Sequence, residues 1–229
     1  KYRSRLGPVT ELGNGWDYSY DLRVEAQGAD RVVWDGNTRR DVYSARPGGT
    51  WAHPEFFREL FLNPGSGEHE LVFADGGRWT FRSLADPVAP GRVAAIVDRN
   101  GNAMTFEYDV AGRLAVVRDT LHTVSNPREV VIGYDANGRI ATVTDWTGRE
   151  VHYSYYKAGD TGGNPGDLES VTTPAVVTTP DYPLPAGPGH AFPAGKTTLY
   201  TYATGTGDPQ LDGNLLTVTD PKGQTWLEN

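Results

Sequence analysis

A sequence motif that occurs twice between residues 112 and 155 decides the fold of this chain. The first copy of the motif is Gly112-Arg-Leu-Ala-Val-Val-Arg-Asp119, and the second copy is Gly138-Arg-Ile-Ala-Thr-Val-Thr-Asp145. Each copy is followed by a segment with alternating apolar residues and a tyrosine near its end, at residues 130–135 and 151–155. A further copy starts at Arg92 and leads to Tyr108. Because alternation with period two is typical of β-strands, the stretch predicts an array of β-hairpins.

In these copies and two later ones, apolar residues lie one and four places after the arginine-like position. The pairs are Val93 and Ile96, Leu114 and Val117, Ile140 and Val143, Leu168 and Val171, and Leu215 and Val218. A helix would place both members on one face, but glycine or asparagine stands just before the copies and the segments are too short for a stable helix. We therefore predict strands. In a regular strand the two positions point to opposite faces, so the first strand of each unit is expected to be apolar on both sides.

The second strand of each unit carries aromatic and β-branched residues at alternate positions. They are Phe106 and Tyr108; Val130, Ile132 and Tyr134; Val151, Tyr153 and Tyr155; Tyr200 and Tyr202. If successive hairpins lie side by side, these side chains form a ladder whose contacts stabilise the units together. Insertions lengthen the later units, at residues 159–167, which are rich in glycine, and at residues 173–196, which contain six prolines. Proline prevents regular ladder pairing, so both insertions are expected to be loops.

The pattern of the first ninety residues predicts strands and turns, but these residues contain no clear copy of the repeated motif. The pairs Asn14-Gly15, Asp35-Gly36 and Asp75-Gly76 favour tight hairpin turns, because these residue types tolerate positive φ. Strands are predicted at residues 16–24, 31–34, 40–44, 71–73 and 78–81. Residues 54–60 begin with proline and contain acids but no glycine, which predicts a short helix or helical turn.

The composition excludes several classes of protein. The net charge is −8 and the basic residues are scattered, so nucleic acid is not an expected partner. No apolar run is long enough to span a membrane as a helix, and the first residues lead into no signal segment. Cysteine is absent, which excludes disulfides and thiolate metal sites but leaves export open.

The repeated motif resembles the YD repeat of the Rhs family. The resemblance is carried by Gly112-Arg113-Leu114, by Tyr134-Asp135-Ala-Asn-Gly138-Arg139-Ile140 and by Asp145-Trp-Thr-Gly148-Arg149, with Tyr155 closing the unit. It covers residues 91–225, and residues 13–21 and 75–81 look like the more divergent β segment that often precedes such repeats. After Tyr155 the units depart from the pattern, because they lose the Tyr-Asp pair.

The resemblance implies an architecture. In the Rhs family the repeats form β-hairpins wound into a spiralling sheet, which in bacterial toxins closes into a shell around a toxic polypeptide. About five repeat units are too few to enclose a cargo, so we expect a segment of a larger shell or a shorter open arc. The expected partners are the remainder of a larger Rhs-type polypeptide or an enclosed toxin segment. Exposed ends of the array also favour self-association.

Three sequence patterns are candidates for catalytic or metal-binding chemistry. The loop around Thr161 superficially resembles the glycine-rich segment of a serine protease nucleophile, but no histidine comes with a supporting motif, which favours a plain loop. The Asp-x-x-Gly turns at Asp98, Asp145 and Asp220 have too few oxygens for a calcium loop and favour turns. In full Rhs toxins an Asp-Pro-x-Gly near the end of the shell takes part in self-cleavage. Asp220 matches its first position, which makes it the one catalytic candidate, although a turn is favoured.

Exposed aromatic residues are a candidate binding surface for sugars. Trp51, Trp146 and Trp226 lie in or near predicted turns and are expected to be exposed, where their faces can stack on a sugar ring. The other aromatics lie at strand positions that suit a packed face.

These observations give one main interpretation. We expect an all-β chain of stacked hairpins in a curved or spiralling antiparallel sheet, with a divergent segment at residues 1–90 and the repeat array at residues 91–229. The expected function is a non-catalytic structural segment of a secreted or cell-surface Rhs-type protein, without cofactor or metal. The alternatives are a module that binds glycans or cell surfaces, and a self-processing protease segment.

Overall fold

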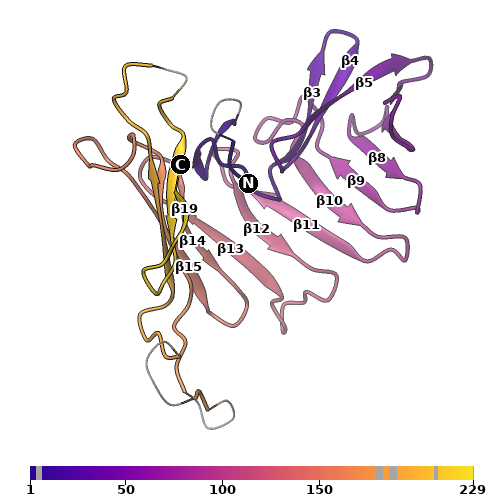
Figure 1. Ribbon diagram of the computed structural model, residues 1–229. Coiled ribbons are helices and arrows are strands. Elements are labelled where there is room, and N and C mark those ends of the chain that lie inside the picture. The colour runs from indigo at the N-terminus through magenta and orange to yellow at the C-terminus, as the bar shows by residue number, and fades with distance from the viewer. Residues whose placement is uncertain (4–6, 179–182, 186–189, 209–210, 229) are drawn as a thin grey trace. The chain divides into compact units, whose positions relative to one another are not determined.

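A computed structural model describes residues 1–3, 7–178, 183–185, 190–208 and 211–228. The described residues contain nineteen strands and no helix, and every strand pairing among them is antiparallel (Figure 1). The prediction of an all-β chain of hairpins is thereby confirmed. The chain divides into two compact units: unit 1 comprises Lys1 and Asp17–Val131, and unit 2 comprises Tyr2–Trp16 and Ile132–Asn229. The sequence-based boundary near residue 90 separates divergent from regular repeats, which is a different division, and it stays a prediction.

Unit 1 begins with a small sheet that passes into a larger one. Strands β3 (Leu22–Gln27), β4 (Asp30–Asp35) and β5 (Arg40–Arg46) pair in order. The first half of β5 pairs with β4, whereas its last three residues pair with β6 (Thr50–Ala52), so β5 turns a corner between two sheets. The larger sheet continues in chain order through β7 (Arg58–Leu62), β8 (His69–Phe73), β9 (Arg78–Phe81), β10 (Val93–Val97), β11 (Ala103–Tyr108), β12 (Leu114–Arg118) and β13 (Glu129–Tyr134).

The core of unit 1 contains side chains from both of these sheets. Val24 donates its backbone N–H to the carbonyl of Gly91, so β3 lies beside the start of β10. The inward residues of the strands are almost completely shielded from water, namely Leu22, Val24, Val32, Tyr43, Leu60, Leu71, Phe81 and Val93. Burial of large apolar side chains is the main stabilising contribution in such a core.

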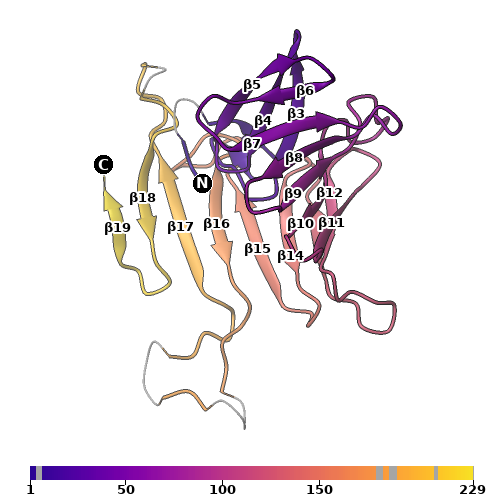
Figure 2. The ribbon, with the colours of Figure 1, turned by 90° about the vertical axis from the view of Figure 1, so that its right-hand side faces the viewer.

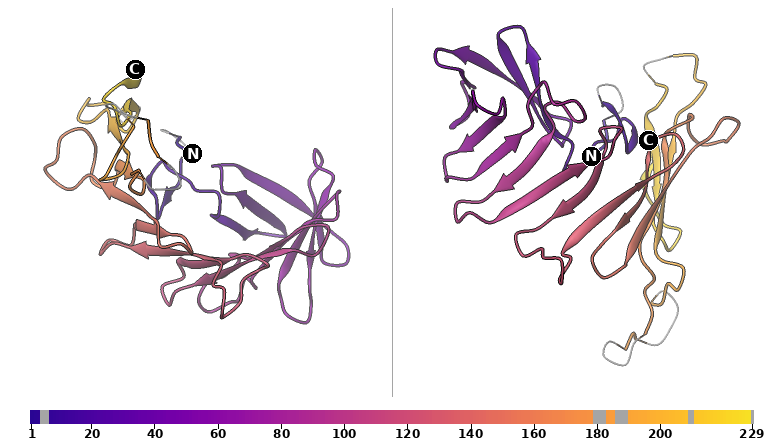
Figure 3. Two further views of the ribbon diagram at one scale, coloured as in Figure 1. Left: turned by 90° about the horizontal axis from the view of Figure 1, so that it is seen from below. Right: turned by 180° about the vertical axis from the view of Figure 1, so that it is seen from behind.

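Unit 2 is one sheet with the N-terminal segment laid against it. After the end of β13 come β14 (Ile140–Thr144), β15 (Glu150–Tyr155), β16 (Leu168–Thr172), β17 (Thr197–Tyr202), β18 (Leu215–Thr219) and β19 (Thr225–Glu228). Figure 2 shows β15 to β19 side by side in chain order, and Figure 3 shows the hairpin connections from two further directions. The N-terminal segment contributes the short hairpin of β1 (Val9–Thr10) and β2 (Gly13–Asn14).

Three local predictions in the first ninety residues were wrong. The helix predicted at residues 54–60 is absent, and residues 58–60 belong to β7, because Leu60 is fully buried between Trp51 and Leu71 of the neighbouring strands. The tertiary environment here outweighs the helical preference of the residues. The strand predicted from residue 16 begins only at Leu22, and the turn of the first hairpin lies at residues 11–12 rather than at Asn14-Gly15. The turns at Asp35-Gly36 and Asp75-Gly76 are confirmed.

The expectation that the two apolar positions of each first strand point to opposite faces was also wrong. Tyr108 is paired with Leu114, and Phe106 is paired with Val117, with a β-bulge between the two pairs. Directly paired residues of antiparallel strands share a face, and residues two apart on one strand share it too. Because the bulge inserts one extra residue, the apolar positions one and four places after the arginine lie on the same face. The same register recurs at Tyr155 with Leu168 and Tyr153 with Val171, and at Tyr202 with Leu215 and Tyr200 with Val218.

Candidate functional site

In three of the second strands, the tyrosine near the end of the strand connects two repeat units. Its backbone pairs with the first strand of the following unit, and its hydroxyl donates a hydrogen bond to the first strand of its own unit. Tyr108 donates to the carbonyl of Val93 at 2.7 Å, Tyr155 to Ile140 at 2.7 Å and Tyr202 to Leu168 at 2.8 Å. Burial raises the pKa of Tyr155 and of Tyr202 well above its usual value, so both hydroxyls stay protonated as donors. This recurring bridge is the chemical centre of the repeat.

The aspartate of each repeat shapes the turn that follows. In Asp109 one carboxylate oxygen accepts the backbone N–H groups of Ala111 and Arg113, both at 2.9 Å, and the other is held by the guanidinium of Arg113. Asp145 holds the backbone of Thr147 and Arg149 and the Arg149 guanidinium in the same way. The hydroxyl of Thr147 also donates to Asp145, at 2.6 Å, and this bond, followed by those from Arg149 and the backbone, holds the pKa of Asp145 far below its usual value, because all of them favour the carboxylate form.

The other repeat residues named from the sequence fit the same structural role. Gly112, Gly138 and Gly148 all have positive φ, and a side chain on Gly112 would place its Cβ 2.5 Å from the carbonyl oxygen of Val88. Leu114 and Ile140 are buried, and Tyr134 ends β13 immediately before Asp135. Arg139 departs from the pattern, since its guanidinium lies over the ring of Tyr155.

The N-terminal segment contacts corresponding positions of successive units in unit 2. The backbone carbonyl of Glu11 accepts a hydrogen bond from the backbone N–H of Ile140 at 2.7 Å, and the backbone N–H of Asn14 donates one to the carbonyl of Gly166. Trp16 donates its indole N–H to the hydroxyl of Tyr202 at 2.8 Å. Tyr2 lies beside Tyr202 and donates to the carbonyl of Gly213, and burial raises the pKa of Tyr2 to about 12. Sequence reasoning missed this role of Tyr2, Glu11, Asn14 and Trp16, because the N-terminal segment contains no copy of the repeated motif.

The two faces of the sheet in unit 2 have different chemistry. One face carries the tyrosine bridges together with partly exposed Val143, Tyr153, Val171, Tyr200 and Val218. The opposite face carries serine and threonine residues, which pair across strands as Ser154 with Ser170 at 2.7 Å, Thr172 with Thr197 at 2.9 Å and Thr201 with Thr217 at 2.6 Å. We call these the apolar face and the hydroxyl face. The hydroxyl face is suited to water, whereas the apolar face leaves aromatic and aliphatic surface partly uncovered.

Asp220 has the same surroundings as the other turn aspartates. Its carboxylate accepts the backbone N–H groups of Lys222 at 2.9 Å and Gln224 at 2.8 Å, as Asp98 does with Asn100 and Asn102. These hydrogen bonds lower its pKa. The geometry is that of a repeat turn, and the self-processing assignment stays a prediction.

The loop at residues 159–167 is folded around Tyr156. A Cβ on Gly163 would lie 2.2 Å from the ring of Tyr156, whose hydroxyl donates to the carbonyl of Tyr200. Asp167 is buried and accepts from Asn14 and from the backbone of Asn164. Thr161 is exposed on this loop. Among the described residues no group of three or more acidic or histidine side chains is arranged to hold a metal ion.

The three tryptophans named for sugar binding differ in exposure. Trp146 is 50% exposed and Trp226 is 75% exposed, as expected from their place in or beside turns. The expectation for Trp51 was wrong, because it lies in β6, is buried, and donates its indole N–H to the carbonyl of Ala29. The guanidinium of Arg31 covers the Trp51 ring at 4.3 Å.

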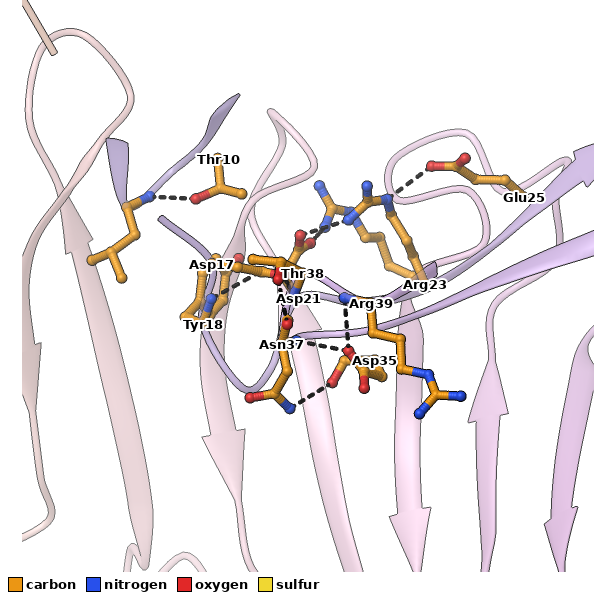
Figure 4. Close-up of polar contacts among 12 residues, drawn as sticks. Thr10, Asp17, Tyr18, Asp21, Arg23, Glu25, Asp35, Asn37, Thr38 and Arg39 are labelled. Atoms are coloured by element: carbon orange, nitrogen blue, oxygen red, sulfur yellow. Dashed lines mark hydrogen bonds and ion pairs between the residues drawn. The ribbon is translucent and has the colours of Figure 1, made fainter. Parts of the chain in front are cut away.

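A polar cluster in unit 1 fixes the segment before β3 (Figure 4). The buried carboxylate of Asp17 accepts the backbone N–H groups of Tyr18 and Thr38, at 2.8 and 2.6 Å. Thr38 has a φ of 65°, which is strained for a branched residue, and this hydrogen bond holds it there. Asp21 forms ion pairs with Arg23 and Arg92. Burial raises the pKa of Asp17, while the backbone donors oppose the rise.

Residues 91–124 match the family model described as RHS Repeat. The chain carries the RHS repeat. The resemblance to the Rhs family is therefore confirmed, and the matched residues contain the bridge from Tyr108 to Val93 and the turn at Asp109.

Three known proteins are similar to this chain. Double-stranded DNA deaminase toxin A of Burkholderia cenocepacia (strain H111) is 26% identical over 182 residues, covering 69% of this chain and 13% of that protein. The crystal structure of TcdB2-TccC3-Cdc42 has a TM-score of 0.39 at 14% identity, covering 87% of this chain and 10% of that one. A structure of the Photorhabdus luminescens Tc holotoxin pore has a TM-score of 0.30 at 15% identity, covering 90% and 14%. The chain thus spans a small part of the length of each of these relatives.

Proposed function

We propose that the chain is a structural wall segment of a larger, secreted or cell-surface Rhs-type polypeptide and that its apolar face holds a polypeptide. The observation that carries this proposal is the tyrosine bridge, which recurs in both units and joins neighbouring strands within each of them. Each bridge ties three strands together, because the tyrosine is paired with one neighbour and bonded to another. A sheet built in this way is stiff and can be lengthened by adding units.

The difference between the two faces supports the proposed partner. Side chains such as Val171 and Tyr200 lie on the apolar face and are partly exposed, whereas the hydroxyl face is satisfied by its own cross-strand hydrogen bonds. Partly exposed aromatic and aliphatic surface gains free energy when another chain covers it. A polypeptide partner is therefore expected on the apolar face alone.

A photo-crosslinking experiment in the full-length gene product tests this function. A photoreactive phenylalanine analogue is placed at Val171 on the apolar face, and in a separate variant at Thr172 on the hydroxyl face. The proposal expects crosslinks between the repeat and a polypeptide segment outside it from position 171 and few from position 172. Equal crosslinking from the two positions, or none from position 171, would contradict it.

A second function is supported by the exposed Trp146 and Trp226, whose faces are available to stack on sugar rings. A glycan array tests it with the wild type, Trp146→Ala and Trp226→Ala, using Trp51→Phe as a buried control. Glycan binding that the two exposed substitutions abolish would favour a binding module. Binding at background level in the wild type would remove this candidate.

A further inference from the structure

Two tyrosines on the apolar face of unit 2 have hydroxyls that the fold does not use. Tyr153 and Tyr200 lie two residues before the bridging tyrosines Tyr155 and Tyr202, and therefore on the same face of the sheet. The bridging hydroxyls each donate to a backbone carbonyl of the sheet. Among the residues that the structure describes, the hydroxyls of Tyr153 and Tyr200 form no hydrogen bond. These two donors thus take no part in holding the repeat together.

Both hydroxyls are protonated, and both can be reached from the apolar face. Burial raises the pKa of Tyr153. Burial also raises the pKa of Tyr200, and the nearby Tyr153 adds to that rise, so both phenols are hydrogen-bond donors at neutral pH. The two side chains are nevertheless partly exposed, and so is Val171 of β16, the strand between them. An apolar surface with two available donors beside it results.

In unit 1 the corresponding position is apolar and is covered by polypeptide. Phe106 lies two residues before the bridging tyrosine Tyr108, and it is only 3% exposed. The ring of Tyr20, from the segment before β3, packs edge-on against it with 5.4 Å between the ring centres. Phenylalanine accepts this cover without any hydrogen-bond partner. A tyrosine covered at the same position needs an acceptor, because a buried hydroxyl without one is destabilising.

In unit 2 polypeptide covers the neighbouring part of the apolar face. The backbone N–H of Asn14 donates to the carbonyl of Gly166, and the indole of Trp16 donates to the hydroxyl of Tyr202. The ring of Trp16 also lies 5.2 Å from that of Tyr200, edge to face. Across the described part of the chain this cover stops short of Tyr153, which stays partly exposed. In both units the covering group comes from the same polypeptide, which indicates the kind of partner that continues the cover.

We propose that Tyr153 and Tyr200 donate hydrogen bonds to backbone carbonyls of an extended segment of the same polypeptide, from outside residues 1–229, which packs an apolar side chain beside Val171. This inference rests on the proposed function, because it names the contacts through which the apolar face holds a polypeptide. An extended segment fits because its carbonyls are open to an outside donor, whereas those within a helix are already bonded. Tyrosine suits the contact, since it supplies a large apolar ring and a donor together.

The full-length gene product tests the inference, with the photoreactive phenylalanine analogue at Val171 as the reporter. The analogue is itself apolar, so the apolar surface is kept. The yield of crosslinks to the outside segment is measured over a series of urea concentrations that leave the repeat folded, which gives the equilibrium constant for docking of the segment. We expect Tyr153→Phe and Tyr200→Phe together to lower this constant at least about tenfold, because two carbonyls lose their donors.

The matched control is Ser154→Ala, which removes a hydroxyl from the opposite face of the same strand and should leave docking unchanged. If the double variant does not fold, as judged by circular dichroism, Tyr153→Phe alone applies the same test. Unchanged docking in the tyrosine variants, or an equal loss in the control, would overturn this inference while leaving the proposed function in place. Absence of crosslinks in the wild type would contradict the proposed function itself. Crosslinks to a different protein would overturn the assignment of the segment to the same polypeptide.

Discussion

In unit 1 the strands bury their inward leucines and aromatics between two layers, whereas in unit 2 the same kind of hairpin has one sheet and an N-terminal segment as its only cover among the described residues. Leu60 and Leu71 of unit 1 are completely buried. In unit 2, side chains equally shielded from water lie near one end of the strands, for example Leu168 and Tyr202. Further along the same strands Val171 and Tyr200 stay partly exposed.

This difference shows two ways of stabilising a repeat. Unit 1 depends on apolar burial in the manner of an ordinary domain. Unit 1 contains one tyrosine bridge, from Tyr108 to Val93. Unit 2 contains two, from Tyr155 and Tyr202, and adds hydrogen bonds from Asn14 and Trp16 of the N-terminal segment. The second arrangement leaves an apolar surface available to a partner, which agrees with the proposed function.

The largest effect is expected for a substitution in the core of unit 1. Leu60→Ala removes a fully buried side chain and should lower the free energy of unfolding by about 3 kcal/mol, because it loses transfer free energy and leaves a cavity. Leu215→Ala in unit 2 is the matched control, and its cost should be about 1 kcal/mol, since Leu215 is partly exposed. Urea unfolding followed by circular dichroism measures both. Equal costs would mean that the two units are buried alike.

A second prediction concerns the pH dependence of unit 1. His69 is buried in β8, where its Nε2 accepts a hydrogen bond from Arg31 at 3.2 Å and its ring lies 5.4 Å from that of Trp51. Burial, and then the charge of Arg31, lower the pKa of His69 from 6.5 to about 4. Between these two values the unfolded chain binds the proton and the folded chain does not, so stability falls as the pH falls from 6.5 to 4.

The size of this loss is at most about 3 kcal/mol, since each pKa unit corresponds to about 1.4 kcal/mol. The measurement is the urea midpoint of the wild type and of His69→Gln at several values between pH 4 and pH 7. Carboxylates elsewhere titrate in both proteins, so the difference between the two curves isolates His69. Parallel curves would show that His69 has the same pKa in the folded and unfolded chain.

A third prediction tests the tyrosine bridge itself. In unit 2 the hydroxyl of Tyr202 donates to Leu168 and accepts from Trp16, so Tyr202→Phe leaves two buried polar groups without a partner. The expected cost is about 2 kcal/mol. Tyr153→Phe is the control, because Tyr153 is partly exposed on the same face, and it should change stability by less than about 0.5 kcal/mol. A cost for Tyr202→Phe no larger than that of the control would remove the bridge as the stabilising element.

Much of the repeat was predictable because its residues act locally. The turn at Asp145 depends on its own neighbours, Thr147 and Arg149, and glycine at 148 supplies the positive φ, so the sequence motif contains the whole turn. The alternation of Tyr153 and Tyr155 likewise predicts their strand, because period two is a local property.

Other features depend on contacts between distant residues and were not predictable from the pattern. The bulge beside Leu114 is visible only when its pairing with Tyr108 is known, and β7 exists because Leu60 is buried between two other strands. The N-terminal segment contacts residues more than a hundred positions away, such as Gly166.

The smallest effect is expected at Asp220, the one residue for which the sequence suggested catalysis. Its carboxylate accepts the backbone N–H groups of the following turn, as do Asp98 and Asp145 elsewhere in the chain. Asp220→Asn retains an acceptor oxygen for those N–H groups. If shaping the turn is the whole role of Asp220, both the variant and the wild type keep one intact mass during prolonged incubation. Asp145→Asn is the matched control at an equivalent turn. Cleavage of the wild type that Asp220→Asn abolishes and Asp145→Asn does not would show that the turn also performs self-processing, because the two aspartates accept the same pair of backbone N–H groups in their turns.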